Sequence, residues 1–135
     1  MAFRSGVRQS AHDRVIQVVA ATQTKHDAYT NPGPQHNCSV RIGLETVYPD
    51  LVLCKPGTMT VDFLIEVETE DSVTEAEASQ WATYACGPGS FWLLVPSSEL
   101  LAAQTLCWRK GIAANFGCWW NDGLAVGFRW LKTAA

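Results

Sequence analysis

The sequence lacks the features of several large classes of protein. Its 135 residues contain no apolar run near the roughly 20 residues that a membrane-spanning helix needs. The most apolar N-terminal stretch, Val15–Ala21, includes a glutamine and has no convincing cleavage site, so no signal peptide is expected. Charged residues are 17% and hydrophobic residues 47%, which excludes a disordered polyelectrolyte. These features predict one domain over residues 1–135, in a cytoplasmic protein without a membrane partner.

The five cysteines form no metal-binding or disulfide pattern. Their spacings are wide, no C-x-x-C occurs, and an odd number leaves at least one thiol without a partner in the chain. We therefore expect reduced cysteines that pack as small hydrophobic residues in a reducing compartment. The three histidines, His12, His26 and His36, show no ligand spacing, so each is expected to be structural or exposed.

Positive charge is missing from the middle of the chain. The net charge is −3, yet residues 42–80 alone carry −8, because nine carboxylates there face only Lys55. No lysine or arginine occurs from Pro56 to Trp108. An acidic segment repels nucleic acid unless a cation or a basic rim offsets its charge. The segment is therefore either a solvated acidic face or a place where a metal binds.

The order of apolar patterns and turn residues predicts an α/β fold with a mixed sheet flanked by helices. The expected elements are a helix over 11–25, strands over 40–47, 51–54 and 59–69, a helix over 72–85, a strand over 91–95, a helix over 97–110 and a hairpin of 116–120 with 124–130. Ser72-Val73-Thr74-Glu75 matches a capping box, so Ser72 is the expected cap. The passage from 59 to 95 should connect two parallel strands by a right-handed crossover.

Three carboxylates could meet where two of these strands adjoin. Glu66 and Glu68 are two residues apart on one strand and therefore share a face. Asp50 opens the preceding strand, but the simplest register places it opposite Phe63, so twist, a bulge or side-chain reach must bring it to Glu66. Carboxylates that meet there would repel one another, and a divalent cation would relieve that repulsion, with the Val67 carbonyl as a further ligand. The alternative is a polar strand face turned to solvent.

The same residues resemble the signature of the PD-(D/E)XK nuclease superfamily. Pro49-Asp50, fifteen residues, and then Glu66-Val67-Glu68 match its acidic motif. Gln80-Trp81-Ala82-Thr83-Tyr84 resembles the Q-x-x-x-Y motif of RecB-like members, and the size is similar to that of small Holliday-junction resolvases. The resemblance covers roughly residues 11–112. It implies the restriction-endonuclease-like fold with its αβββαβ core.

The resemblance also implies roles for particular residues. Asp50 and Glu66 match the acids that bind Mg²⁺ or Mn²⁺, and Val67 matches the position whose carbonyl often joins them. Some members add an acid from the first helix, for which Asp13 is the candidate and Asp27 a weaker one.

Gln80 and Tyr84 would lie one turn apart on a helix and line the same cleft, where Gln80 would orient water or phosphate and Tyr84 could contact backbone or base. Glu68 stands where the family usually has lysine, and it would act as the general base for an attacking water. An ordinary helix flank is the alternative for Gln80 and Tyr84.

Three functions follow from these patterns. The first is a metal-dependent nuclease on nucleic acid, with DNA preferred to RNA as the expected partner. The second is a catalytically degenerate member of that fold that acts as a binding or assembly module, which the missing lysine favours. The third is an unrelated α/β protein with an incidental acidic face. The resemblance to small nucleases, which often pair two active sites on one duplex, also implies a homodimer, with the apolar hairpin 116–130 as a surface that two chains could share.

Overall fold

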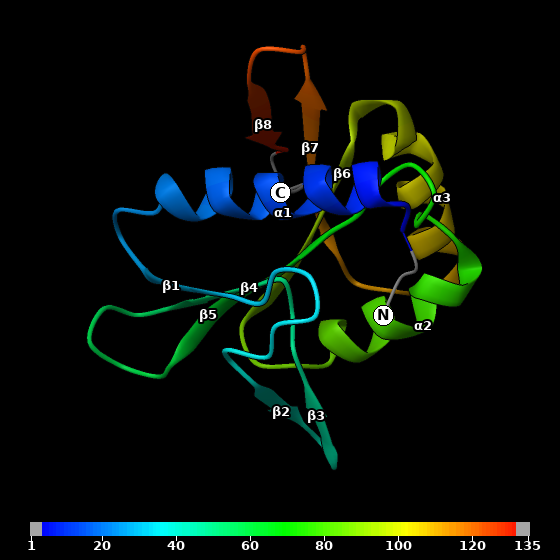
Figure 1. Ribbon diagram of the computed structural model, residues 1–135. Helices are drawn as coiled ribbons and strands as arrows, with labels where there is room; N and C mark the ends of the chain where they lie inside the picture. The colour runs from blue at the N-terminus through cyan, green and yellow to red at the C-terminus, as the bar shows by residue number, and fades with distance from the viewer. Residues whose placement is uncertain (1–3, 132–135) are drawn as a thin grey trace.

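Six strands form one mixed sheet with helices on both of its faces (Figure 1). The computed structural model describes residues 4–131. The elements are α1 (Gly6–Ala21), β1 (Asp27–Thr30), β2 (Val40–Ile42), β3 (Glu45–Val47), β4 (Leu51–Cys54), β5 (Val61–Val67), α2 (Glu75–Ala85), β6 (Ser90–Pro96), the 3-10 turn η1 (Ser97–Glu99), α3 (Leu100–Lys110), β7 (Asn115–Asn121) and β8 (Val126–Trp130). The strand order is β1-β4-β5-β6-β7-β8, and β2 and β3 form a separate hairpin that projects from the body. The predicted α/β class with a mixed sheet is confirmed.

The directions of the strands follow from their connections. β1, β4 and β5 pair antiparallel, whereas β5, β6 and β7 pair parallel because α2 and α3 connect them. Parallel strands need such crossover connections. The predicted parallel pairing of the strand over 59–69 with the strand over 91–95 is confirmed by the pairing of β5 with β6. β8 returns antiparallel to β7 at the far edge.

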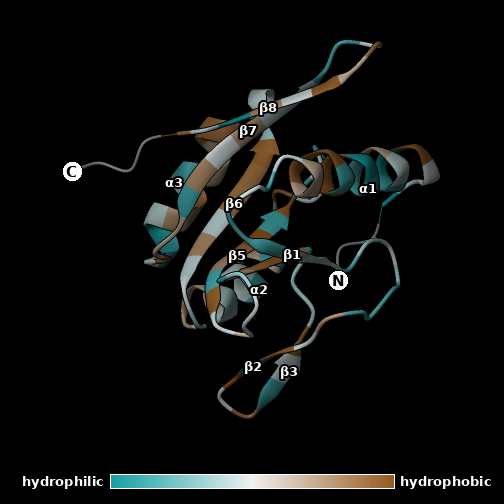
Figure 2. Ribbon diagram, turned by 90° about the vertical axis from the view of Figure 1, so that its left-hand side faces the viewer, coloured by the Kyte–Doolittle hydropathy of each residue, from teal (hydrophilic) through white to brown (hydrophobic). Residues whose placement is uncertain are grey.

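Helices cover both faces of the sheet, and each face has its own apolar core. α1 packs Val15, Ile16 and Val19 against one face, and all three side chains are completely buried. α2 and α3 cover the other face, where Trp81 and Ala103 are completely buried. The central strands β5 and β6 are therefore apolar along most of their length (Figure 2). Four of the five cysteines are buried and all five are free, as expected of small apolar side chains.

Several boundaries differ from the predicted ones for local reasons. α1 begins earlier, at Gly6, because the Ser5 hydroxyl accepts a hydrogen bond from the Arg8 N–H and caps the helix. The predicted single strand over 40–47 is instead the β2–β3 hairpin, whose turn contains Gly43 with φ of 61°. The cap of α2 is Thr74, which accepts from the Glu77 N–H, so the prediction of Ser72 as cap was wrong. β1 was not predicted.

The register of β4 against β5 corrects the expectation for Asp50. Leu51 pairs with Ile65, so Asp50 lies opposite Glu66 and not Phe63. Two features produce this shift of three residues. The connection is longer than expected, with Cys54 paired to Val61, and a bulge between Leu53 and Cys54 adds one more residue. Because the shift is odd, it moves Asp50 to the same side of the sheet as Glu66.

Candidate functional site

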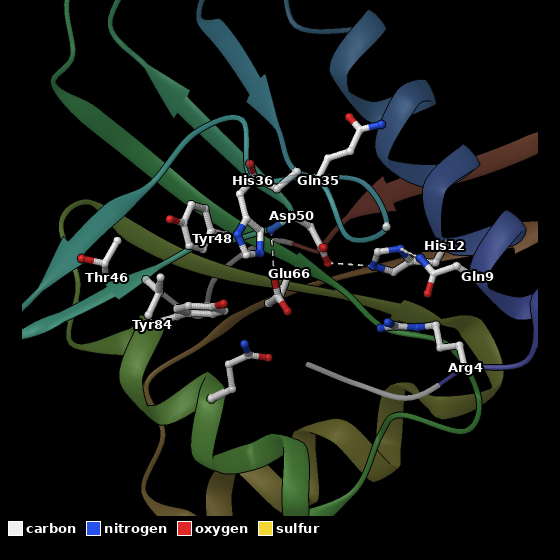
Figure 3. Close-up of a pocket in the computed structure, with 14 residues that line it drawn as sticks. Arg4, Gln9, His12, Gln35, His36, Thr46, Tyr48, Asp50, Glu66 and Tyr84 are labelled. Atoms are coloured by element: carbon white, nitrogen blue, oxygen red, sulfur yellow. Dashed lines mark hydrogen bonds and ion pairs between the residues drawn. The ribbon is translucent and has the colours of Figure 1, made fainter.

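A cavity of about 230 Å³ lies where β4 begins and β5 ends, between α1, α2 and the β2–β3 hairpin (Figure 3). Most of the residues that line it are of polar type, and they come from segments far apart in the sequence: Arg4, Gln9, His12, Asn31, Gly33, Gln35, His36, Thr46, Val47, Tyr48, Asp50, Glu66, Gln80 and Tyr84. The structure thus brings four of the residues predicted for the site to a single cavity. The predicted residues among them are Asp50, Glu66, Gln80 and Tyr84.

Asp50 and Glu66 are held together by reciprocal hydrogen bonds to the backbone. The Asp50 N–H donates to Glu66 Oε1 at 2.8 Å, and the Val67 N–H donates to Asp50 Oδ2 at 2.8 Å. Both residues are buried, with 8% and 6% of their surface exposed. The alternative of a polar strand face turned to solvent is therefore wrong for these two residues.

Each of these carboxylates keeps one oxygen for a ligand. Within residues 4–131, no N–H or hydroxyl group donates to Asp50 Oδ1 or Glu66 Oε2, and both side chains line the cavity, where the two carboxyl groups also interact with each other. Burial raises the pKa of Glu66 well above its usual value, and the neighbouring Asp50 and Glu68 charges raise it further. A proton or a cation in the cavity would relieve this accumulation of negative charge.

His12 is one residue of the site that the sequence analysis missed. It lies on α1, and its Nε2 is 2.9 Å from Asp50 Oδ2 while its Nδ1 is 2.9 Å from Asp13 Oδ1. Burial lowers the pKa of His12, but the hydrogen bond and charge of Asp50 outweigh burial, and the pKa is raised overall. The His12 side chain is only 4% exposed. No spacing in the sequence indicates this contact, because the partners are 38 residues apart.

Asp13, predicted as a metal ligand, lies behind His12. Its Oδ1 accepts from the Gln9 side chain and from the Gly33 N–H in addition to contacting His12. It therefore orients the imidazole and fixes the loop after β1, and it does not line the cavity. Asp27, the weaker candidate, pairs with Cys54 at the opposite end of β4, where its side chain accepts from the Gly57 N–H.

Glu68, predicted as the general base, is completely buried beside the cavity. Its Oε1 accepts from Arg4 Nη2 at 3.0 Å and from the Ser72 hydroxyl at 2.8 Å, and its Oε2 accepts from the Trp81 indole at 2.7 Å. Burial raises the pKa of Glu68 to about 7, against the lowering by Trp81, Ser72 and Arg4. Both carboxylate oxygens accept hydrogen bonds from other side chains, and Glu68 is not among the cavity-lining residues.

Arg4 brings positive charge to a site that has no lysine. Its Nε donates to Thr69, and its Nη2 lies within hydrogen-bond distance of Glu68, Ser72 and the Val67 carbonyl, the last at 3.2 Å. The guanidinium thus already contacts the carbonyl that was predicted as a metal ligand. The Arg4 side chain is 5% exposed and lines the cavity. In the part of the chain that the structure describes, its Nη1 donates to no acceptor.

Gln80 and Tyr84 line the cavity from α2, as their spacing predicted. No hydrogen bond from residues 4–131 engages either side chain. Burial raises the pKa of Tyr84, and the charges of Glu66 and Asp50 raise it further, so the phenol stays neutral. Both groups are thus free to donate hydrogen bonds to a ligand.

The donor set fits a hard divalent cation held by a few protein ligands. Asp50 and Glu66 each offer one oxygen while a backbone N–H fixes the other, an arrangement that orients ligating carboxylates. Within residues 4–131, however, no three His, Cys, Asp or Glu side chains are arranged as a complete metal site. Mg²⁺ is commonly bound by only one or two carboxylates, with water and substrate phosphate completing its ligands. The residues present therefore offer a cation two carboxylate oxygens, and any further ligands would have to come from elsewhere.

Comparisons with protein-family models, with curated proteins and with solved structures found no match to this chain. Among the helices of residues 4–131, none is long and apolar enough to cross a membrane.

Proposed function

We propose that this protein is a metal-dependent phosphodiesterase that hydrolyses nucleic acid, with Mg²⁺ or Mn²⁺ held by Asp50 and Glu66. The observation that supports it most strongly is the pair of buried carboxylates clasped by backbone N–H groups, each with one oxygen left for a ligand. When bound, the cation would polarise the phosphate and lower the pKa of an attacking water. The hydroxyl of the water is added to phosphorus, and its proton ends on the leaving oxygen.

The chain's own residues would divide the remaining tasks. Arg4, with Nη1 unengaged and its other nitrogens fixed, would bind a non-bridging phosphate oxygen and supply the positive charge that the missing lysine would otherwise supply. Glu68 then acts as the positioning residue for Arg4 and not as the general base. Gln80 and Tyr84 would orient water and phosphate from α2.

The order of elements supports a restriction-endonuclease-like core. α1 precedes three antiparallel strands of the main sheet, β1, β4 and β5, and α2 then leads to β6, which pairs parallel to β5. This is the helix, three strands, helix, strand order that the resemblance implies, with the β2–β3 hairpin inserted after β1. Nucleic acid, with DNA preferred, remains the proposed partner. A homodimer is proposed through the β7–β8 hairpin, which exposes Trp120 and Leu124.

A second function is favoured by one specific observation. The position usually occupied by lysine holds Glu68, whose carboxylate is fully engaged, and the Val67 carbonyl is already contacted by Arg4. A degenerate nuclease fold that binds nucleic acid without cleaving it would have this arrangement. The two candidates differ in turnover and not in fold.

Calorimetric titration with Mn²⁺ tests the first proposal. Saturable binding is expected for the wild type and should be lost in Glu66→Gln and in Asp50→Asn. Asp62→Asn is the matched control, because Asp62 lies on the same strand but pairs with Lys55 and His26 away from the cavity. No binding at millimolar Mn²⁺ would contradict the metal site.

Cleavage assays on single-stranded and duplex DNA and RNA then separate the two candidates. Cleavage in Mn²⁺ that Glu66→Gln abolishes supports the phosphodiesterase. Metal binding without cleavage of any of these polymers would support the binding module.

A further inference from the structure

Two aromatic rings are stacked on the wall of the cavity. The imidazole of His36 and the phenol of Tyr48 lie with their centroids 3.9 Å apart and their planes 8° apart. Both residues line the cavity beside Asp50 (Figure 3). His36 is exposed and Tyr48 is half-buried, so the pair is not part of either apolar core. An aromatic pair at this place needs an explanation other than core packing.

The pair is held in place by a buried asparagine. Asn31, 4% exposed, donates to the carbonyls of Cys38 and Pro49 and accepts from the N–H groups of Asn37 and Cys38. These bonds fix the chain on both sides of the stack, since Asn37 follows His36 and Pro49 follows Tyr48. The rings are therefore preorganised, and a ligand that contacts them loses little free energy to ordering them.

The size of the cavity limits what can enter it. About 230 Å³ is below the roughly 300–1,000 Å³ of pockets that enclose a whole drug-sized ligand. Tyr48 precedes Asp50 by two residues, a spacing of at most about 7 Å along an extended chain. A phosphate near Asp50 would thus place the base of the same or the next nucleotide within reach of the stack.

We propose that an unpaired base of a nucleic acid strand stacks on the His36–Tyr48 pair while the adjoining phosphate lies at Asp50 and Glu66. This inference rests on the proposed function and adds a substrate class to it, namely single-stranded ends, loops or unpaired bases. In a duplex, both faces of each internal base are covered by its neighbours. Stacking on aromatic side chains is therefore open only to unpaired or terminal bases, and it tolerates any base because each has a π-face.

The binding test uses a fluorescently labelled eight-nucleotide DNA strand in Ca²⁺, with fluorescence anisotropy as the measurement. Tyr48→Leu is expected to weaken binding of the single strand by about tenfold, because stacking of one base on an aromatic side chain has an effect of that order. Tyr48→Phe preserves the ring and should bind within about twofold of the wild type. Binding to an eight-base-pair duplex should be weaker than to the single strand and less affected by Tyr48→Leu, because only the terminal base pairs of a duplex expose a face.

An abasic residue, placed at each position of the strand in turn, makes the test specific for stacking. At one position the abasic residue should weaken binding to the wild type by about as much as Tyr48→Leu does. Binding of that abasic strand should not weaken further in Tyr48→Leu, because the two changes remove the same contact. The proposal would be overturned if Tyr48→Leu weakened binding of the intact strand and of every abasic strand equally. It would also be overturned if the wild type bound the duplex more tightly than the single strand. His36→Leu provides a second variant if Tyr48→Leu does not fold.

Mn²⁺ calorimetry on the same variants separates this proposal from the function on which it rests. Mn²⁺ binding in Tyr48→Leu should equal that of the wild type. If Mn²⁺ binding is normal but the abasic strand shows no coupling to Tyr48, the stacking proposal is wrong and the metal site stands. If Mn²⁺ does not bind while the coupling is present, the metal-dependent function fails and the base site stands.

Discussion

His12 Nε2 lies 2.9 Å from Asp50 Oδ2, so one imidazole joins α1 to the start of β4. The other nitrogen of the ring contacts Asp13 Oδ1 at 2.9 Å. The ring therefore separates two carboxylates, and the raised pKa of His12 follows from Asp50 despite the opposing effect of burial. Without the imidazole, the Asp50 carboxylate would lose its side-chain partner in a cavity that the Glu66 carboxyl also lines.

Loss of this imidazole should destabilise the protein measurably. His12→Ala leaves the buried Asp50 oxygen without its side-chain partner and opens a space beneath α1, so we expect a loss of about 2–4 kcal/mol in the free energy of unfolding. His26→Ala is the control, because His26 pairs with Asp62 where both side chains are partly exposed, and it should cost about 1 kcal/mol or less. Urea denaturation of both variants provides the measurement, and equal losses would contradict this view of His12.

The raised pKa of Glu66 predicts a pH-dependent difference in stability between the metal-free wild type and Glu66→Gln. A carboxyl whose pKa is raised on folding stabilises the fold fully below its unfolded pKa of 4.5, and this contribution is lost as pH rises through the folded pKa. The wild type should therefore lose stability relative to Glu66→Gln from pH 5 to pH 8.

Denaturant unfolding in EDTA at the two pH values measures this difference. Glu68 and His12 are present in both proteins, so the difference reports the Glu66 carboxyl together with its interaction with Asp50 and Glu68. A difference that stays constant with pH would refute the raised pKa. Added Mn²⁺ should stabilise the wild type and leave Glu66→Gln unchanged, because a ligand that binds only the folded state stabilises it.

The Arg4–Glu68 ion pair should show strong coupling. Arg4→Met leaves the completely buried Glu68 carboxylate without its charge partner, which we expect to cost about 3–5 kcal/mol at pH 8. Arg4→Met combined with Glu68→Gln should regain much of that loss, because the neutral amide needs no counter-charge. Denaturant unfolding of the two single variants and the double variant gives the coupling energy, and simple additivity would contradict the pairing.

Gly89 should tolerate no side chain. Its φ is +72°, and a Cβ there would lie 2.5 Å from the carbonyl oxygen of Asp62, the extra residue of the β5 bulge. Gly89→Ala is expected to cost more than about 2 kcal/mol, since neither backbone can move without disturbing the β5–β6 pairing. Gly57→Ala is the matched control with φ of +74° and open space around it, and it should cost only about 1–2 kcal/mol. Thermal unfolding compares the two.

The sequence predicted those features of the fold that depend on neighbouring residues. The turn Lys55-Pro56-Gly57-Thr58 forms as expected, with the Thr58 N–H donating to the Lys55 carbonyl, because Pro and Gly stand where a type II turn requires them. Gly111 ends α3 in the left-handed conformation for the same kind of reason. β1 escaped prediction because Asp27–Thr30 is a four-residue edge strand whose side chains are all half-buried, so no alternation marks it.

The site was predicted only in part, because its remaining contacts depend on packing. Asp50, Glu66, Gln80 and Tyr84 line one cavity as the motif suggested. The sequence did not show that other side chains would engage Glu68, since its partners include Arg4, which is 64 residues earlier in the chain. The pairing of Asp50 with Glu66 also required a bulge, which no residue in the sequence announces.

The β4–β5 connection has a further consequence for how the protein tolerates change. Residues added at the tip, between Lys55 and Thr60, would leave the facing of Asp50 and Glu66 intact, since the paired residues beyond them keep their partners. If instead the strands paired regularly from Cys54 and Val61 onward, with Asp62 in the ladder and no bulge, Asp50 would lie opposite Ile65 and Glu66 would turn to the other side of the sheet. The chemistry of this cavity thus depends on parity: two carboxylates face each other because the bulge leaves one residue between them and the turn unpaired.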